Sequence, residues 1–213
     1  MRRFAAVNRL TERRGASIIP SNNPRAAGEG GMDMETVTTE RLLLRPWRME
    51  DAQDLYAYAR DPEVGPNAGW RPHADVEESK KILAMFQEKG EVWAIEERAS
   101  GRVVGSLGLE EDAKRSNPAA RSMGYVLARP WWGQGLMTEA AGAALAYGFE
   151  RMGLEIVSIC HFDFNARSKR VIEKLGFTYE GTLRRAHVRV LSGEVCDELC
   201  YSMTRAEYEG RRK

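Results

Sequence analysis

Hydrophobic residues recur along this chain with two different periods, and each period predicts one kind of element. Apolar side chains spaced three or four residues apart form one-sided stripes in residues 49–59 and 75–87, which is typical of amphipathic helices. Shorter apolar or alternating runs between the stripes are typical of strands. Helices are expected over residues 49–59, 75–87, 136–152 and 165–175. Strands are expected over residues 42–45, 92–96, 102–109, 123–128, 156–164, 179–191 and 194–203.

The order of these elements predicts the fold class. The chain is expected to be α/β (α+β), with a mixed sheet of about seven strands and helices on both faces. The order of its elements is a strand, two helices, three strands, a helix, a strand, a helix and two strands. Residues 156–164 are apolar on both alternating faces, as in a central strand covered by helices. With 213 residues, 43% hydrophobic and 30% charged, the chain can form one good core. We therefore expect one folded domain over residues 35–213.

Residues 1–34 have a different composition. They contain six arginines, three acidic residues and a Ser-Asn-Asn-Pro stretch, and they lack a regular apolar pattern. This segment is expected to be a disordered basic tail. One alternative is a basic arm that binds RNA or a ribosome. Another is an unstructured leader, or extra sequence upstream of a start at Met32 or Met34.

Charge and cysteine content limit the classes of partner. Lysine and arginine number 32 against 31 acidic residues, so no overall field favours nucleic acid or an anionic membrane. No apolar run approaches the roughly 20 residues of a membrane-spanning helix, and the N-terminus lacks the apolar core of a signal peptide. Three cysteines indicate a reducing compartment, so a cytoplasmic location is expected. No metal site is expected, because Cys196 and Cys200 would lie about 13 Å apart on one strand.

The most informative stretch covers residues 124–140, which predict a strand, a turn containing Gly133 and Gly135, and the start of an alanine-rich helix. Two glycines separated by one residue let backbone N–H groups converge on one point. The helix adds unpaired N–H donors and the positive end of its dipole. Such a turn is suited to a pyrophosphate, although two glycines alone also fit an ordinary strand-to-helix connection.

Six short motifs follow one another along the chain. They are Thr-Glu-Arg-Leu-Leu-Leu-Arg at residues 39–45, Gly-Ser-Leu-Gly-Leu at 105–109, Gly-Tyr-Val-Leu at 124–127, Trp-Gly-Gln-Gly at 132–135 with Thr-Glu-Ala at 138–140, Asn-x-x-Ser at 165–168, and Lys-Leu-Gly-Phe at 174–177 with Glu-Gly-Thr-Leu at 180–183. In this order they resemble the GCN5-related N-acetyltransferases (GNAT). The branch that the chain resembles is that of the Rim-type (RimJ/RimL) ribosomal-protein N-terminal acetyltransferases. The resemblance covers residues 38–203.

The resemblance implies transfer of an acetyl group from acetyl-CoA, as co-substrate, to a primary amine. The acceptor would be a protein or peptide N-terminal α-amine or a small amine, and the GNAT fold would have a mostly antiparallel sheet splayed at the cofactor cleft. The CoA pyrophosphate would lie at Gly133, Gln134, Gly135, Leu136, Met137 and Thr138. The pantetheine arm would pair like a strand with Tyr125, Val126 and Leu127 and would bind Asn165.

Two positions depart from the family pattern. Pro130 stands where relatives carry Gln or Arg, which removes a backbone donor. Ser122 stands where many relatives carry a Glu that acts as the base. Direct attack needs a neutral amine, and a lysine costs roughly 3.5 kcal/mol more to deprotonate than an α-amine. A weak base therefore favours α-amines.

The base must then come from another residue. Glu110, at the end of a strand entering the cleft, is the first candidate, acting through a water, and Asp197 is the second. Ser168 matches a hydroxyl that would protonate the departing thiolate, and a backbone N–H of residues 125–127 would bind the oxyanion. Structural interpretations stay open: Asn165 also fits a helix N-cap, and Glu110 a solvated strand end.

The acceptor site is expected between the two early helices, their connecting loop and the final hairpin. The predicted acceptor contacts are Trp70, His73 and Asp197. Two other functions stay open: a catalytically weak acyl-CoA-binding module, and a ribosome- or RNA-associated protein that uses the basic tail. The sequence is also compatible with a homodimer.

Overall fold

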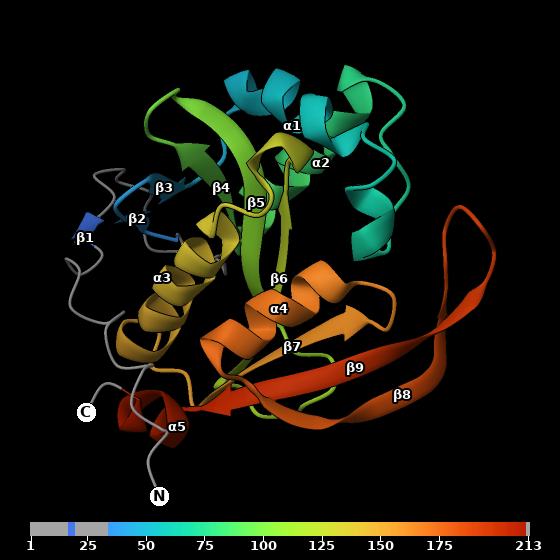
Figure 1. Cartoon of the computed structure of the whole chain (residues 1–213). Helices are drawn as coiled ribbons and strands as arrows, with labels where there is room; N and C mark the ends of the chain where they lie inside the picture. The colour runs from blue at the N-terminus through green and yellow to red at the C-terminus, as the bar shows by residue number, and fades with distance from the viewer. Residues whose placement is uncertain (1–16, 20–33, 212–213) are drawn as a thin grey trace, which may run out of the picture.

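The computed structural model describes residues 17–19 and 34–211 (Figure 1). One nine-stranded sheet has the strand order β1-β2-β3-β4-β5-β6-β7-β9-β8. The strands are β1 (Ser17–Ile19), β2 (Thr36–Thr38), β3 (Leu42–Arg45), β4 (Val92–Glu97), β5 (Arg102–Glu111), β6 (Ala120–Leu127), β7 (Ile156–Phe162), β8 (Thr178–Val188) and β9 (Val195–Thr204). The α-helices are α1 (Ala52–Ala59), α2 (Val76–Lys89), α3 (Leu136–Glu150), α4 (Ala166–Leu175) and α5 (Arg205–Gly210), and the short 3-10 helices are η1 (Met49–Asp51), η2 (Gly65–Ala68) and η3 (Arg129–Trp131).

The predicted order of seven strands and four helices is confirmed, and besides the 3-10 helices the structure adds two short strands and one short α-helix. One is α5, which begins with a capping box: Glu207 N–H donates to Thr204 Oγ1, and Thr204 N–H donates to Glu207 Oε2. The Thr-x-x-Glu pattern at residues 204–207 is the sequence signal of this box. The others are β2 and β1, and β1 lies within the predicted tail. The rest of residues 1–33 lies outside the described residues, so the expected disorder stays a prediction.

The side chains of β4 and β5 alternate between two hydrophobic clusters, as strand geometry requires. Trp93 and Ile95 pack into a cluster with α3 and α4, whereas Ala94, which lies between them, packs into a cluster with α1 and α2. Helices therefore cover both faces of this part of the sheet, as predicted. None of the helices in residues 34–211 combines the length and apolar composition that crossing a bilayer needs.

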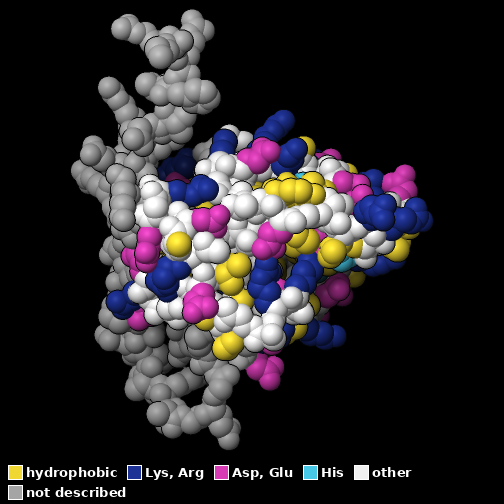
Figure 2. All heavy atoms as spheres, turned by 90° about the horizontal axis from the view of Figure 1, so that it is seen from below, with side chains coloured by type: hydrophobic (Ala, Val, Ile, Leu, Met, Phe, Trp, Pro, Cys, Tyr) yellow, Lys and Arg dark blue, Asp and Glu magenta, His cyan; other side chains and the backbone are white. Residues whose placement is uncertain are grey.

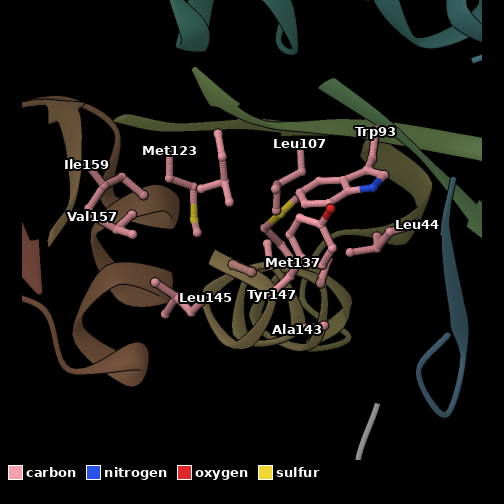
Figure 3. Packing of buried hydrophobic residues seen from close by; sticks show 14 of the residues in the cluster. Leu44, Trp93, Leu107, Met123, Met137, Ala143, Leu145, Tyr147, Val157 and Ile159 are labelled. Carbon is pink, nitrogen blue, oxygen red and sulfur yellow. The ribbon is translucent and has the colours of Figure 1, made fainter. Parts of the chain in front are cut away.

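The larger cluster lies between the sheet and α3 (Figure 3). Ala140, Ala141 and Ala144 of α3 are completely buried, which lets the helix backbone approach the strands closely. Trp93 packs edge-on against Tyr147, with ring centroids 5.1 Å apart, and its indole N–H donates to the carbonyl of Glu35 at 2.9 Å. The chain around Glu35 is thus attached to both the sheet and α3.

The sheet divides between β6 and β7, its one parallel pair among the described strands. The two strands pair only from Ala120 with Ile156 to Met123 with Ile159. Beyond this point β6 stays paired with β5 as far as Leu127, and β7 stays paired with β9 as far as Phe162. Residues 124–127 therefore have a strand on one side only, and the expected splay is present.

A buried ion cluster attaches η1 to the sheet. Arg45 of β3 is 4% exposed and donates two hydrogen bonds to Asp51, at 2.7 and 2.8 Å, and one to Glu96, at 2.7 Å. Asp51 also accepts the backbone N–H of Arg48 at 2.8 Å. These charged groups have little contact with water, so each is stabilised mainly by its partners. Removing one partner should therefore lower the free energy of unfolding much more than breaking a surface ion pair does.

We expect Arg45→Ala to destabilise the fold by about 3–5 kcal/mol, because Asp51 would stay buried without its counter-ion. The matched control is Arg102→Ala. Arg102 pairs with Asp54 at 2.5 Å but its side chain is 60% exposed, so its loss should cost less than about 1 kcal/mol. Urea unfolding of both variants measures the difference. Equal losses would show that burial does not set the strength of the Arg45 cluster.

Candidate active site

A cavity of about 540 Å³, the first cavity, opens where β6, the glycine turn, α4 and η2 meet. Nine of the ten residues predicted to bind the cofactor line it, namely Tyr125, Val126, Leu127, Gly133, Gly135, Leu136, Met137, Thr138 and Asn165. Gln134 does not line it: its side chain donates to the carbonyl of Pro130 at 3.0 Å. Ser168 also lines the cavity. Tertiary structure thus brings together residues from four separate segments.

The glycine turn has the backbone that its sequence requires. Gly133 and Gly135 have φ angles of +76° and +79°, in the left-handed region that side-chain-bearing residues rarely adopt. Gly135 is the N-cap of α3, and no side chain among the described residues caps this helix. The first N–H groups of α3 therefore point out of the helix without a side-chain partner, which is the arrangement that binds anions.

Glu139 holds the turn from the side away from the first cavity. Its carboxylate accepts hydrogen bonds from Thr39 Oγ1 at 2.6 Å and from the backbone N–H and Nε of Arg41 at 2.8 and 2.7 Å. Burial alone would raise the pKa of Glu139, but these bonds outweigh burial and lower it. Arg41 also donates to the carbonyl of Gln134 at 2.9 Å, so these bonds fix the turn and leave a guanidinium beside Gly135.

The edge of β6 that faces away from β5 offers backbone groups to the first cavity. Ala128 N–H donates to Val104 O at 2.7 Å, so by the alternation of antiparallel pairs the N–H and C=O groups of Tyr125 and Leu127 point away from β5. The carbonyl of Leu127 accepts the indole N–H of Trp132 at 2.6 Å. The N–H and C=O of Tyr125 and the N–H of Leu127 are therefore placed to pair with a peptide-like arm.

Asn165 and Ser168 lie at the first turn of α4. Asn165 Oδ1 accepts the backbone N–H of Ser168 at 3.1 Å, so the cap interpretation holds, and its Nδ2 donates to the carbonyl of Asn67 at 3.0 Å. The hydroxyl of Ser168 lies 3.0 Å from the phenol oxygen of Tyr125. Burial raises the pKa of Tyr125 to about 12, against the opposite effect of the Ser168 hydrogen bond. The phenol therefore stays protonated at neutral pH.

Sequence reasoning missed three basic residues of the first cavity. Arg167, Arg170 and Lys174 of α4 line it. Their spacing of three and four residues places them on one helix face, a signal that the sequence contained. The guanidinium of Arg167 also lies over the ring of Trp132, 4.1 Å from its centroid. Three cations beside an anion-binding turn fit a ligand with several phosphates.

Residues 41–178 match the family described as Acetyltransferase (GNAT) domain. The chain belongs to the GNAT acetyltransferase family. It is 30% identical over 182 residues to the uncharacterized N-acetyltransferase p20 of Bacillus licheniformis, covering 83% of this chain and 100% of that protein. It is also 30% identical over 152 residues to the uncharacterized N-acetyltransferase YoaA of Bacillus subtilis, covering 69% and 85% of the two chains. The protein is therefore an acyltransferase of the GNAT N-acetyltransferase family.

Solved structures share the GNAT fold. A GNAT-family acetyltransferase from Bacillus anthracis aligns with a TM-score of 0.73 at 23% identity, over 81% of this chain and 99% of that one. The ribosomal-protein-S5-alanine acetyltransferase from Vibrio fischeri aligns with a TM-score of 0.69 at 19% identity, over 81% and 98%. The microcin C7 self-immunity acetyltransferase MccE, in complex with acetyl-CoA and AMP, aligns with a TM-score of 0.65 at 19% identity, over 78% and 93%. At these identities the likeness establishes the fold.

The residues predicted to bind the acceptor of this GNAT chain do not line the first cavity. Trp70 and His73 pack against each other, with ring centroids 5.2 Å apart, and His73 Nδ1 lies 2.8 Å from Ser79 Oγ. Burial lowers the pKa of His73. Asp197 accepts the backbone N–H of Arg185 at 2.7 Å, within the final hairpin. The structure thus places these three residues in two separate local clusters.

Glu110 lies directly opposite Ser122 in the β5–β6 pair. Ser122 stands at the position where the family resemblance places a base. Glu110 is therefore the cross-strand neighbour of that position. Glu110 is half-buried, and among the described residues its carboxylate accepts no hydrogen bond. Glu110 lines neither the first cavity nor the cavity on the opposite sheet face, so its carboxylate would reach a bound amine only through a water.

A second cavity, of about 500 Å³, is lined by Ser122 of β6, Ser158 and Cys160 of β7, Cys200 of β9 and the loop after β5. Ser158 and Cys160 alternate with Val157 and Ile159, which pack toward α3. This cavity therefore lies on the sheet face opposite α3 and α4. Cys160 lies directly opposite Cys200 in the β7–β9 pair. The sequence argument about cysteine spacing concerned only Cys196 and Cys200, which lie on the same strand.

The described surface carries charges of both signs. Figure 2 views the GNAT domain from below, and on that face Lys and Arg side chains are interspersed with Asp and Glu side chains, with hydrophobic side chains between them. The formal net charge of +1 has the same balance. On this face the described residues form no single-sign field of the kind that attracts nucleic acid.

We expect Gly135→Trp to weaken CoA binding at least about 100-fold, because the indole would cover the turn and the first N–H groups of α3. The forced left-handed φ should cost about 1–2 kcal/mol of stability. Gly101→Trp is the matched control: Gly101 has a φ of +67°, nothing lies within 4 Å of its Cβ position, and it does not line the first cavity. Calorimetric titration with CoA measures both; undiminished affinity of the Gly135 variant would contradict the anion site.

Proposed function

We propose that this protein transfers the acetyl group of acetyl-CoA to a primary amine by direct attack within a ternary complex. The acceptor is the N-terminal α-amine of a protein or peptide, or a small amine. One observation carries the proposal: the free edge of β6, the glycine turn and the uncapped start of α3 all border the first cavity. A pantetheine arm that ends in a diphosphate matches this sequence of backbone donors.

In this proposal each part of the cofactor has a matching surface. The diphosphate lies on the N–H groups of residues 133–138, with Arg41 close by. The pantetheine pairs with Tyr125 and Leu127 and meets Asn165 at the start of α4. The basic face of α4, with Arg167, Arg170 and Lys174, is suited to the remaining phosphate of CoA. The complex of MccE with acetyl-CoA supports the same cofactor for this fold.

The amine nitrogen adds to the thioester carbonyl carbon to give a tetrahedral intermediate, whose carbon–sulfur bond then breaks to release the thiol of CoA. Glu110 takes the amine proton through a water, since Asp112, another acid nearby, already accepts bonds from Ser158, Arg115 and the N–H of Lys114. Ser168 gives its hydroxyl proton to the sulfur and regains a proton from solvent, with Tyr125 holding the serine oxygen. A backbone N–H of residues 125–127 stabilises the oxyanion.

The Vibrio fischeri neighbour is named as an acetyltransferase of an alanine of ribosomal protein S5, and this supports an α-amine acceptor. The amine approaches through the second cavity, on the face opposite α3 and α4. Trp70, His73 and Asp197 remain the predicted acceptor contacts, although none of them lines either cavity. A cytoplasmic location, consistent with the three free cysteines, is part of the proposal.

An amine panel tests the function. With acetyl-CoA, we expect thiol release with Ala- and Ser-initiated peptides and little with an N-blocked lysine peptide at pH 7, because a lysine costs roughly 3.5 kcal/mol more to deprotonate. For an α-amine the rate should rise about tenfold per pH unit and level off near pH 7.8. CoA binding without thiol release on any amine would instead indicate a binding module.

Glu110→Gln should lower kcat/KM for the best amine by about 10²–10⁴, as for loss of a general base, while leaving CoA affinity unchanged. The control is Glu97→Gln, a carboxylate that bonds to Ser100 and lies opposite Arg102, at the end of β5 remote from Glu110. Stopped assays of thiol release measure both variants over a range of pH. If kcat/KM of Glu110→Gln lies within threefold of the control value, Glu110 is not the base and another residue must have this role.

A further inference from the structure

Two cysteines and a glutamate converge in the wall of the second cavity. Cys160 and Cys200 face each other across β7 and β9, with their sulfur atoms 3.3 Å apart. One ligand atom from each of Cys160, Glu198 and Cys200 lies within 4.8 Å of the others. All three residues are half-buried. The mechanism proposed above uses none of them.

A cation already occupies the centre of this group. The ammonium of Lys114 lies 2.7 Å from Glu198 Oε2, 3.2 Å from Cys160 Sγ and 3.7 Å from Cys200 Sγ. The three side chains thus present their acceptor atoms to one point, which a positive charge fills. The stem of Lys114 belongs to the loop after β5 and its side chain is 45% exposed, so the ammonium can withdraw into water without disturbing the sheet.

The ligand atoms have the chemistry and spacing that zinc requires. Zinc binds thiolate sulfur at about 2.3 Å and carboxylate oxygen at about 2.0–2.2 Å in tetrahedral sites, which places two sulfurs about 3.8 Å apart. The observed 3.3 Å needs a shift of only a few tenths of an ångström at each side chain. Two thiolates select soft cations over magnesium or calcium.

We propose that Cys160, Cys200 and Glu198 form a site for a soft divalent cation of the zinc class, which displaces Lys114. Water from the second cavity, which Cys160 and Cys200 line, completes the coordination. His187, whose Nε2 lies 3.5 Å from Glu198 Oε1, orients this carboxylate. Binding replaces the thiol protons by the metal and releases them to solvent, with no change of oxidation state. The site shares the second cavity with the proposed path of the amine, but binding of the cation requires neither CoA nor an amine.

The site can be tested with the full chain, freed of metal and kept reduced, titrated with Co²⁺ and then with Zn²⁺. Co²⁺ reports its own coordination, because thiolate ligation produces sulfur-to-cobalt charge-transfer absorption. We expect one Co²⁺ per chain, with displacement by Zn²⁺. Cys160→Ser and Cys200→Ser should each weaken binding at least about 100-fold, and Glu198→Gln by about tenfold.

Two further variants make the test specific. Lys114→Met removes the competing ammonium and should tighten Co²⁺ binding about fivefold, a gain that no folding defect can imitate. Cys196→Ser is the matched control, because Cys196 is also on β9 but is buried outside the group, and its loss should leave the titration unchanged. Circular dichroism checks that each variant is folded.

The proposal fails if the unaltered chain gives no charge-transfer absorption at millimolar Co²⁺, or if Cys196→Ser removes it as fully as Cys160→Ser. It also fails if the thiols are consumed as a Cys160–Cys200 disulfide under reducing conditions while no metal is retained. Any of these outcomes leaves the acetyl-transfer proposal standing, since the amine assay is performed without added metal.

Discussion

The separation of β6 from β7 is the constraint on which the rest of the site depends. The two strands pair only as far as Met123 and Ile159, and each then continues with its other neighbour. Backbone donors and acceptors inside a protein need partners, so an open strand edge next to a cavity demands a ligand that can supply them. The fold thus creates a binding edge by ending one ladder early, and the first cavity extends from that edge.

The elements around this opening hold one another in place through a few charged bonds. Glu139 of α3 and Arg41, just before β3, fix the glycine turn from behind, while Arg45, Asp51 and Glu96 attach the early helical segment to the sheet. These bonds join segments far apart in sequence. The bonds to Glu139 and Arg41 preorganise the glycine turn, because they hold its backbone N–H groups in one direction before a ligand binds.

The two cavities lie on opposite faces of the sheet and differ in chemistry. The first is bordered by backbone N–H groups and cations, which suits a phosphorylated carrier, whereas the second contains Ser122, a cysteine pair and several ion-paired acids. In the proposed reaction the thioester lies on one face and the amine approaches from the other, so both cavities are used. The thiols of Cys160 and Cys200 in the second cavity are the ligands of the proposed cation site, which acetyl transfer does not require.

Sequence determined the local features: the order of strands and helices follows from hydrophobic period, and Gly133 and Gly135 follow from backbone sterics, because these signals act between near neighbours. It also identified nine residues of the first cavity, through motifs whose spacing matches a family. Only the tertiary structure decided which distant residues meet. Cys160 lies opposite Cys200 across β7 and β9, and Trp70 and Asp197 lie in separate clusters. Strand register and the path of the α1–α2 loop decide both arrangements, and both are set by long-range packing.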